Sequence, residues 1–472
     1  MEILVYLALA VTLVTLFGAL RLAPASSLGF RPLLSGYAVI VYTMIIYIGI
    51  SAAIPIFFND MVSFWYPTYS TPQTFFWGLA VCWLGIVMFL GFYHYFTRRR
   101  PSDLALPRVF RVDRGYFPLA AYILVCLGTL MKVAYVVHVG GLHSVMVMRS
   151  GGISQMLGYD HTDMLSNDLN YFSLTADAAV CWLLLEAMHC RRQILFHVAL
   201  AGVVLAATLV VTPKREYLII PALAILVGFS IYVRPLRLSH APLFLVGAVG
   251  LSLATLFGRI VVPAYEAGLK IQDFTRSDLI EKFVVRLMSA DLNFFDATVV
   301  AIYGRQDVIA KFGGWWEAFY RPNMEPFTFA IPRVVWPSKP DVLVDVSTAF
   351  RAVERGISLA STDGGNGVGL IGTSWIYGEV IGLALGMALL AWAASFVDRF
   401  LNKMHYASAG RILVFAISLA TLFQLYRQAT IGWCFLNFFQ TMAVFWLTVL
   451  FLTFLANTRP VLRFPAAARQ AT

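Results

Sequence analysis

Charged residues are scarce in this sequence. Only 13% of its 472 residues are charged, whereas 60% are hydrophobic, and the mean hydropathy is +0.76. Soluble domains carry about 25% charged residues, so the composition excludes a soluble enzyme of several domains. Cysteine is also scarce, and all five cysteines lie within or at the ends of apolar stretches, which argues against a disulfide framework. Lipid is therefore the main solvent of this chain.

Several motifs that would indicate familiar chemistry are missing. The chain has no P-loop, no HExxH zinc motif, no CxxC pair and no GxGxxG turn after a strand. It also lacks the Asp-x-Asp pair that holds a metal ion against a nucleotide sugar. These absences disfavour nucleotide-driven and zinc-dependent reactions, and we expect no cofactor and no metal site. The net charge of +10 must first be divided between the two sides of a membrane, so it does not predict nucleic-acid binding.

Long apolar stretches dominate what is present. Lipid offers the backbone no hydrogen-bond partner, so a stretch of roughly 17–25 apolar residues crosses a bilayer as a helix. Eleven such stretches lie at about 2–20, 33–57, 73–96, 116–138, 170–189, 194–212, 217–233, 241–262, 371–393, 411–428 and 434–455. The sequence therefore predicts an all-α polytopic membrane protein with about 11 transmembrane helices. The first stretch lacks a basic flank and a cleavage site, so we expect a retained helix and not a signal peptide.

Basic residues set the predicted orientation. The connection 97–115 holds six arginines, and positively charged loops remain in the cytoplasm. With this connection inside, eighteen basic residues fall on the cytoplasmic side and four in the short outer connections. The amino terminus then lies outside. We expect three regions: a membrane bundle of eight spans at 1–262, an outer loop at 263–370, and three further spans with a cytoplasmic tail at 371–472.

The outer loop has the pattern of a folded cap. Residues 273–304 have the spacing of one amphipathic helix, with Asp278, Lys282 and Arg286 four residues apart on a polar face. The stretch that follows is rich in Trp, Phe and Pro, a composition that suits a membrane interface. We therefore expect a cap with amphipathic helices that lies on the outer leaflet.

Three basic residues lie where the orientation disfavours them. Lys214 and Arg215 interrupt a hydrophobic hairpin at its outer turn, and Arg427 lies near the outer end of the tenth span. Charge is costly to desolvate at such positions, so each residue is a candidate anchor for an anionic group that enters from the outer leaflet. The alternative is a turn or interface at which these side chains reach water.

Further cations lie in the outer loop. Arg333 and Lys339 belong to the run IPRVVWPSKP, whose three prolines stiffen the backbone. Arg286 lies on the predicted amphipathic helix, where pairing with Asp278 or Asp291 is the alternative to a binding role. If the cations converge, they would suit a diphosphate, because arginine donates paired hydrogen bonds to phosphate oxygens. A basic, solvated rim is the competing interpretation.

Four segments on the predicted outer side carry a family resemblance. They are GGLHSVMVMRS, which contains Arg149; TPKREYLIIPALAIL, which contains Lys214 and Arg215; FTFAIPRVVWPSKP with the later GGNGVGLIGTSWIYGEVIGLALG; and YRQAT around Arg427. Together they resemble the Wzy-type oligosaccharide repeat-unit polymerases of bacterial O-antigen and exopolysaccharide pathways, over about residues 130–430. The turn here reads Pro-Lys-Arg-Glu where many members have small residues around one arginine, which leaves the shared role to either Lys214 or Arg215.

The resemblance implies a metal-independent membrane glycosyltransferase with a GT-C-like helix bundle. Its place would be the bacterial cytoplasmic (inner) membrane, with the large loop in the periplasm. Both donor and acceptor would be oligosaccharides linked to undecaprenyl diphosphate, and a chain-length-regulator protein would be a further partner. A hydroxyl of the incoming repeat unit would attack the growing chain, while basic side chains stabilise the charge on the departing diphosphate.

The candidate residues follow from these motifs. The candidate catalytic residues are Arg215, Asp291 and Glu379, and a structural role is the alternative for each acid. The candidate diphosphate- and sugar-binding residues are Arg149, Lys214, Arg215, Arg286, Arg333, Trp336, Lys339 and Arg427. The rival functions are an O-antigen ligase, which uses the same kind of donor, and a polysaccharide or lipid transporter. A transporter needs charge along a path through the bundle, whereas the sequence leaves Lys132 nearly alone at depth, which favours chemistry at the outer face.

Overall fold

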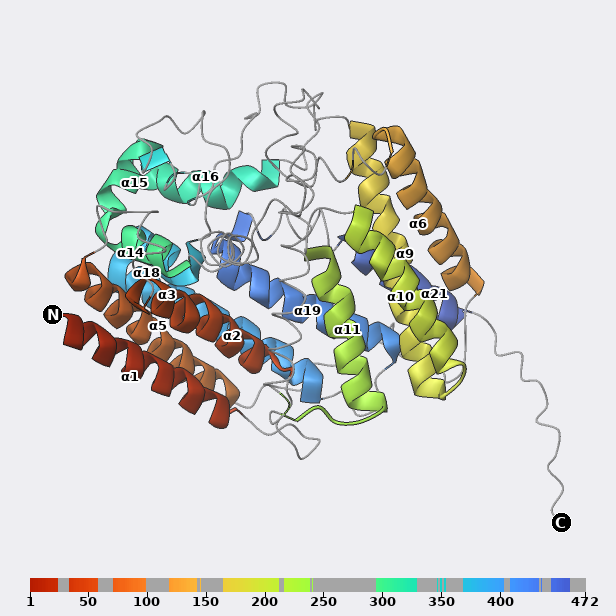
Figure 1. The fold of residues 1–472 in the computed structure, drawn as a ribbon, viewed down its shortest axis with the longest axis horizontal. Helices are drawn as coiled ribbons and strands as arrows, with labels where there is room; N and C mark the ends of the chain where they lie inside the picture. The colour runs from red at the N-terminus through yellow and green to blue at the C-terminus, as the bar shows by residue number, and fades with distance from the viewer. Residues whose placement is uncertain are drawn as a thin grey trace, which may run out of the picture.

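The fold comes from a computed structural model that describes most of the apolar part of the chain. The described residues are 1–23, 34–57, 71–98, 119–141, 164–211, 216–237, 294–328, 368–402, 408–432 and 443–458, with a few single positions between them. Every regular element in these ranges is helical. The helices are α1 (Glu2–Arg21), α2 (Gly36–Met44), the π-helix η1 (Ile45–Ile50), α3 (Ser51–Phe57), α5 (Pro72–Arg98), α6 (Leu119–His138), α9 (Met164–Cys190), α10 (Ile194–Val211), α11 (Glu216–Tyr232), α14 (Phe294–Tyr303), α15 (Arg305–Phe312), α16 (Trp315–Thr328), α18 (Gly369–Asn402), α19 (Ala409–Gln428) and α21 (Ala443–Thr458) (Figure 1).

The helices coincide with the predicted spans. Each predicted span overlaps a helix, except the one at 241–262, which lies outside the described residues. Six helical segments are long and apolar enough to cross a membrane, and α10, α11 and α21 hold shorter apolar segments. The described part of the chain is therefore all-helical, its long apolar helices are those of a multi-pass membrane protein, and the count of eleven spans stays a prediction.

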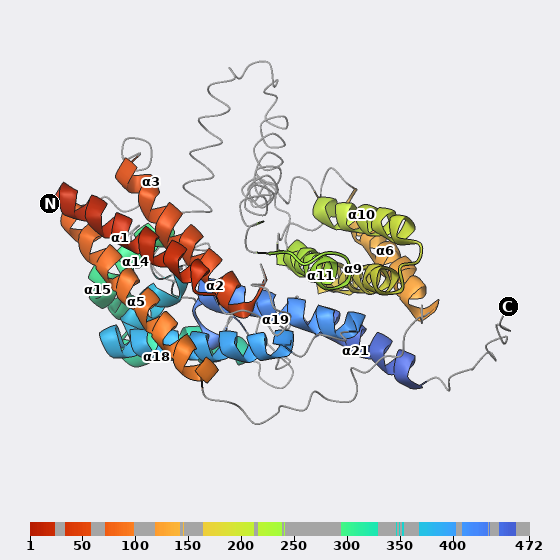
Figure 2. The same cartoon turned by 90° about the horizontal axis from the view of Figure 1, so that it is seen from below.

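The helices form two packed groups joined by α19 (Figure 2). In the first group, α5 packs against α1, α14 and α18. In the second, α9 packs against α6, α10, α11 and α21. The connecting helix α19 contacts α2 and α18 on one side and α9 and α11 on the other. Residues from both groups contribute to one continuous apolar core.

Large apolar side chains cover much of the outer surface of the bundle. Leu195 on α10 is 85% exposed and Ile3 on α1 is 82% exposed. Soluble proteins rarely expose apolar patches of more than a few hundred Å². The exposed apolar faces of α1, α6 and α10 therefore suit a lipid environment.

The helix α14, which falls in the predicted outer loop, packs inside the bundle. The sequence predicts one amphipathic helix over 273–304 on the outer leaflet, but α14 ends at Tyr303, and residues 273–293 lie outside the described part. The side chains of Phe295 and Val299 are buried, and the Phe295 amide donates a 2.8 Å hydrogen bond to Ser51 Oγ. The sequence FFDATVVAIY is largely apolar, and the side chains from Ala297 to Ala301 are all buried. The described part of the predicted amphipathic helix thus packs inside the bundle, and we call the later helices α15 and α16 of the predicted outer loop the cap.

The buried acid Asp398 links the end of α18 to the start of α2 in the first helix group. Asp398, near the end of α18, accepts hydrogen bonds from the amides of Gly36 at 2.5 Å and Tyr37 at 3.0 Å, and from the hydroxyl of Tyr93 at 2.6 Å. The two amides begin α2, where the first N–H groups have no partner within the helix. A carboxylate is favourable there because the N-terminus of a helix carries partial positive charge.

A second buried acid has the same arrangement. Glu186 on α9 is 3% exposed and accepts a hydrogen bond from the backbone N–H of Ala409, the first residue of α19. Both acids therefore have a structural explanation in the helix ends that they meet.

Candidate functional site

The helix α18 is broken near its beginning. Gly378 (φ −170°, ψ 26°) and Glu379 (φ 50°, ψ −127°) have non-helical conformations. In one straight helix, residues eight apart would lie about 12 Å from each other. Ser374 and Gly382 are eight apart, yet a Cβ atom at Gly382 would overlap the carbonyl oxygen of Ser374. The segment 369–377 therefore folds back on the helix that follows. The predicted span at 371–393 is therefore not one straight helix: it includes the turn of a helical hairpin with Glu379 at its tip.

Glycines explain why the two arms of the hairpin approach so closely. Gly382 and Gly386 follow Gly378 at intervals of four residues, so the last two lie on one face of the second arm. A side chain at Gly386 would overlap the side chain of Ser374 on the first arm. Small residues at such spacing permit close helix packing in membranes. This spacing is a sequence signal for the hairpin that hydropathy alone does not reveal.

Two side chains of the cap hold the tip of the hairpin. Arg305, at the start of α15, donates from Nε to the carbonyl oxygen of Ile376 and from Nη1 to Glu379 Oε1, both at 2.9 Å. Trp315, at the start of α16, donates from Nε1 to the carbonyl oxygen of Tyr377 at 2.7 Å. The last carbonyl groups of a helix have no partner within it, and a cation is favoured beside them. The cap thus satisfies the end of the first arm.

Asn323 joins the hairpin tip to the end of α19. Its side-chain amide donates to Tyr377 Oη at 3.0 Å, and its Oδ1 accepts from the Ile431 amide at 3.1 Å. The chain after α19 also passes close to α16, because a Cβ at Gly432 would overlap the carbonyl oxygen of Asn323. We call the group Arg305, Trp315, Asn323, Tyr377, Glu379 and Ile431 the tip junction. In Figure 1, α15 and α16 lie above α14 and α18, on the side of the first helix group.

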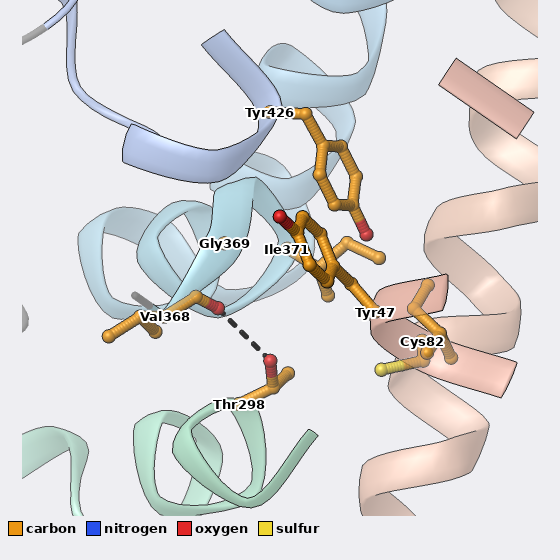
Figure 3. A pocket seen from close by; sticks show the side chains of 8 residues that line it. Tyr47, Cys82, Thr298, Val368, Gly369, Ile371 and Tyr426 are labelled. Carbon is orange, nitrogen blue, oxygen red and sulfur yellow. Dashed lines mark hydrogen bonds between the residues drawn. The ribbon is translucent and has the colours of Figure 1, made fainter. Parts of the chain in front are cut away.

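A small cavity lies beside the start of the hairpin's first arm. Its eight lining residues are Tyr47, Ile48, Cys82, Thr298, Val368, Gly369, Ile371 and Tyr426 (Figure 3). The rings of Tyr47 and Tyr426 stack with centroids 6.2 Å apart, and Thr298 Oγ1 donates to the carbonyl oxygen of Val368 at 3.0 Å. The space open to the centre of a water molecule is about 10 Å³, which is room for about one water. The cavity is therefore too small to hold a sugar ring.

Two of the sequence-predicted site residues lie in the described part of the chain. Glu379 is in the tip junction, with its carboxylate paired to Arg305. Arg427 lies in the last turn of α19, half-buried, just before Ala429 ends the helix in a left-handed conformation. Asn323 connects the two segments that carry these residues, through Tyr377 and Ile431. The other predicted residues, Arg149, Lys214, Arg215, Arg286, Asp291, Arg333, Trp336 and Lys339, lie outside the described residues.

Of the six members of the tip junction, only Glu379 was a predicted site residue, and three of the others lie outside and away from every motif. Arg305, Trp315 and Asn323 belong to no motif that the resemblance supplies. Arg305 does follow Gly304, which marks the end of the apolar pattern of α14, and Trp315 follows the Gly313–Gly314 pair that ends α15. These glycines indicate helix ends, where side chains commonly reach neighbouring backbone groups.

A buried ion pair lies in the second helix group. Lys132 Nζ on α6 lies 2.7 Å from Asp177 Oδ1 on α9 and 2.5 Å from Thr208 Oγ1 on α10. Lys132 is 2% exposed and Asp177 is 0% exposed. The expectation that Lys132 is nearly alone at depth is therefore wrong. Asp177 lies 45 positions away in sequence, and only the packing of α6 on α9 brings the two side chains together.

The two carboxylate oxygens of Asp177 differ in their hydrogen bonding. Within the part of the chain that the structure describes, Asp177 Oδ2 is buried without a hydrogen-bond partner. A buried charge is unfavourable unless its lone pairs are satisfied. The same part of the chain contains no group of three His, Cys, Asp or Glu side chains that could hold a metal ion.

Comparison with known proteins gives no relative, since no protein-family model, no curated protein and no solved structure matches this chain.

Proposed function

We propose that this protein is a Wzy-type polymerase of lipid-linked oligosaccharide repeat units. It joins undecaprenyl-diphosphate-linked units into a bacterial surface polysaccharide at the outer face of the cytoplasmic membrane. The reaction is glycosyl transfer without a metal ion, on a GT-C-like bundle whose large loop lies in the periplasm. A chain-length-regulator protein is its expected partner.

The observation that carries this proposal is the composition of the tip junction. Two segments that resemble the polymerase family, IGTSWIYGEV and YRQAT, lie about 50 positions apart in the sequence. Asn323 of α16 bonds to Tyr377 in the first segment and to Ile431 directly after the second. The helix α16 in turn leads into FTFAIPRVVWPSKP, the third resembling segment. Segments that share a substrate must meet in space, and the tip junction supports such a meeting.

The proposed reaction assigns a task to each kind of residue. An acceptor hydroxyl attacks the anomeric carbon of the growing chain, its new C–O bond replaces the bond to undecaprenyl diphosphate, and its proton passes to a base or to water. Arginines near the outer end of the bundle, Arg427 among them, stabilise the negative charge that develops on the leaving diphosphate. Asp291 and Glu379 are the candidate bases.

Arg427→Ala tests the proposal in a strain that lacks the endogenous protein. We expect polymerisation to fall by about 10²–10³-fold, the usual result of removing one donor to a developing anion. The wild type should restore a long polysaccharide ladder on a gel, and the variant should leave single-repeat material at equal protein level. Arg234→Ala is the control. Arg234 is an exposed arginine just after the C-terminal end of α11, on the predicted cytoplasmic side and so away from the proposed site. A full ladder with Arg427→Ala would contradict the proposed role of Arg427.

The same gel separates a polymerase from a ligase. A ligase transfers chains to the lipid A core, so its loss would remove every capped core, including the band with one repeat. Survival of the one-repeat band in the deletion strain therefore supports the polymerase. Its disappearance would favour the ligase.

One observation favours a transporter as the second candidate function. The pair Lys132–Asp177 lies buried between α6, α9 and α10, and intramembrane ion pairs often mark transport paths. A transport defect would leave lipid-linked units on the cytoplasmic side, inaccessible to reagents added outside. If Lys132→Met/Asp177→Leu, which removes both charges together, produces that defect at normal protein level while Arg427→Ala does not shorten chains, the transporter replaces the polymerase.

A further inference from the structure

At the tip of the hairpin, one carboxylate oxygen of Glu379 has no hydrogen-bond partner among the described residues. Its Oε1 accepts the hydrogen bond from Arg305, and the side chain is 58% exposed. Its Oε2 makes no hydrogen bond to any residue that the structure describes. An ionised carboxylate accepts only, with about four lone-pair positions. The tip thus offers acceptor sites to a ligand that donates hydrogen bonds.

Arg305 holds this carboxylate where it is. Glu379 has φ 50°, a left-handed conformation that a residue with a Cβ atom rarely adopts. Such strain persists only where the surroundings enforce it. The two bonds of the Arg305 guanidinium bracket the turn, one to Ile376 and one to Glu379. A lysine has no planar fork of donors, so it cannot reproduce this pair of bonds.

The surroundings of Glu379 favour a neutral, hydroxyl-rich ligand. The carboxylate repels a diphosphate, so the phosphate groups of the lipid carrier are disfavoured at this point. The indole of Trp315 is 46% exposed and is fixed by its bond to the Tyr377 carbonyl. Trp316, which is 60% exposed, stacks on Tyr320 with ring centroids 6.1 Å apart. Exposed rings present flat apolar faces that match the C–H faces of a sugar, while a carboxylate accepts from its hydroxyl groups.

We propose that Glu379 binds a hydroxyl group of the incoming saccharide and that Arg305 is the positioning residue that holds Glu379 for this contact. This inference rests on the proposed polymerase function and names the group that receives the acceptor sugar. Arg305 itself acts through Glu379 and the hairpin tip, not on the reacting atoms.

The test is a double-mutant cycle on the purified full-length protein in lipid nanodiscs, with lipid-linked repeat units as substrate. Loss of a hydrogen bond to a charged group corresponds to about 10–100-fold, so Arg305→Ala and Glu379→Ala should each raise the acceptor KM by that factor. The double variant should be no worse than Glu379→Ala, because Arg305 acts through Glu379. Additive effects, or an unchanged KM, would overturn the assignment.

Arg321→Ala is the matched control. Arg321 is 27% exposed and pairs with Glu325 at 3.1 Å, while Arg305 is 25% exposed and pairs with Glu379 at 2.9 Å. Both arginines lie in the cap, but the ion pair of Arg321 lies within α16 and does not involve the hairpin. We expect its acceptor KM to stay within about twofold of the wild type, well below the effect of a lost charged hydrogen bond. An equal loss in both variants would mean that Arg305 only stabilises the cap, which overturns the proposal.

A second measurement does not depend on catalysis. No atom lies within 4 Å of a Cβ position built at Gly378, so the side chain of Gly378→Cys has room at the tip. A membrane-impermeant maleimide added to whole cells should label this cysteine, and Arg305→Ala should change the labelling rate while Arg321→Ala does not. An unchanged rate in Arg305→Ala would show that Arg305 does not hold the tip. If labelling responds but Arg427→Ala leaves the polysaccharide ladder intact, the proposed function fails and the hold on the tip stands.

Discussion

Removing one partner of the Lys132–Asp177 pair should destabilise the protein strongly, whereas removing both should not. Lys132→Met leaves the fully buried Asp177 without its cation, and breaking a buried pair in this way costs about 3–5 kcal/mol. Lys132→Met/Asp177→Leu replaces both charges by apolar side chains of similar volume, so we expect it to recover most of that loss. Thr208→Val removes only a hydroxyl partner and should cost about 0.6 kcal/mol, the average for hydrogen bonds between membrane helices.

The free energy of unfolding in mixed detergent micelles, titrated with a denaturing detergent, measures these differences. Leu130→Ala is the control on the same helix, because Leu130 is 62% exposed and lipid is as apolar as the leucine that it loses. Its effect should stay below about 1 kcal/mol. The reasoning is refuted if Lys132→Met also stays below that value, or if the double variant is no more stable than the single one.

Three further changes test the contacts that hold the helices. Tyr93→Phe should lower the free energy of unfolding by about 1.5–3 kcal/mol, because the Tyr93 hydroxyl donates to the buried carboxylate of Asp398; an unchanged value would mean that this hydrogen bond contributes nothing. Gly382→Ala should destabilise the hairpin by more than 1 kcal/mol, since the new methyl group would overlap the Ser374 carbonyl. Gly91→Ala, in open space within α5, should instead stabilise by about 0.5–1 kcal/mol, and equal effects of the two substitutions would contradict the close packing of the hairpin.

The helices of this fold could be predicted from sequence because lipid imposes one simple requirement. A segment within the bilayer must satisfy its backbone internally, so apolar stretches such as 73–96 and 116–138 had to be helical. Hydropathy averages over a window, however, and a window cannot detect a turn between two apolar arms. The stretch 371–393 is therefore apolar throughout, although the chain reverses at Gly378 and Glu379. The spacing of Gly378, Gly382 and Gly386 carries that information.

The tip junction was only partly predictable for a different reason. Glu379 and Arg427 lie in motifs that the family resemblance supplies, so they were candidates from the start. Arg305 and Asn323 act through backbone groups far away in sequence, and no local pattern specifies such a partner. Lys132 illustrates the same limit, since its partner Asp177 is found only through the packing of α6 on α9.

The buried acids Glu186, Asp398 and Asp177 fall into two kinds, and the difference separates the rival functions. Glu186 and Asp398 meet the first amides of α19 and α2, so helix ends explain both. Asp177 lies in the middle of α9 and meets only side chains, so no helix end explains it. A transporter that uses the pair would lose its function when both charges are replaced, whereas a polymerase that works at the tip junction would keep it. The double variant Lys132→Met/Asp177→Leu, which should remain folded, can therefore discriminate between the two functions in a single strain.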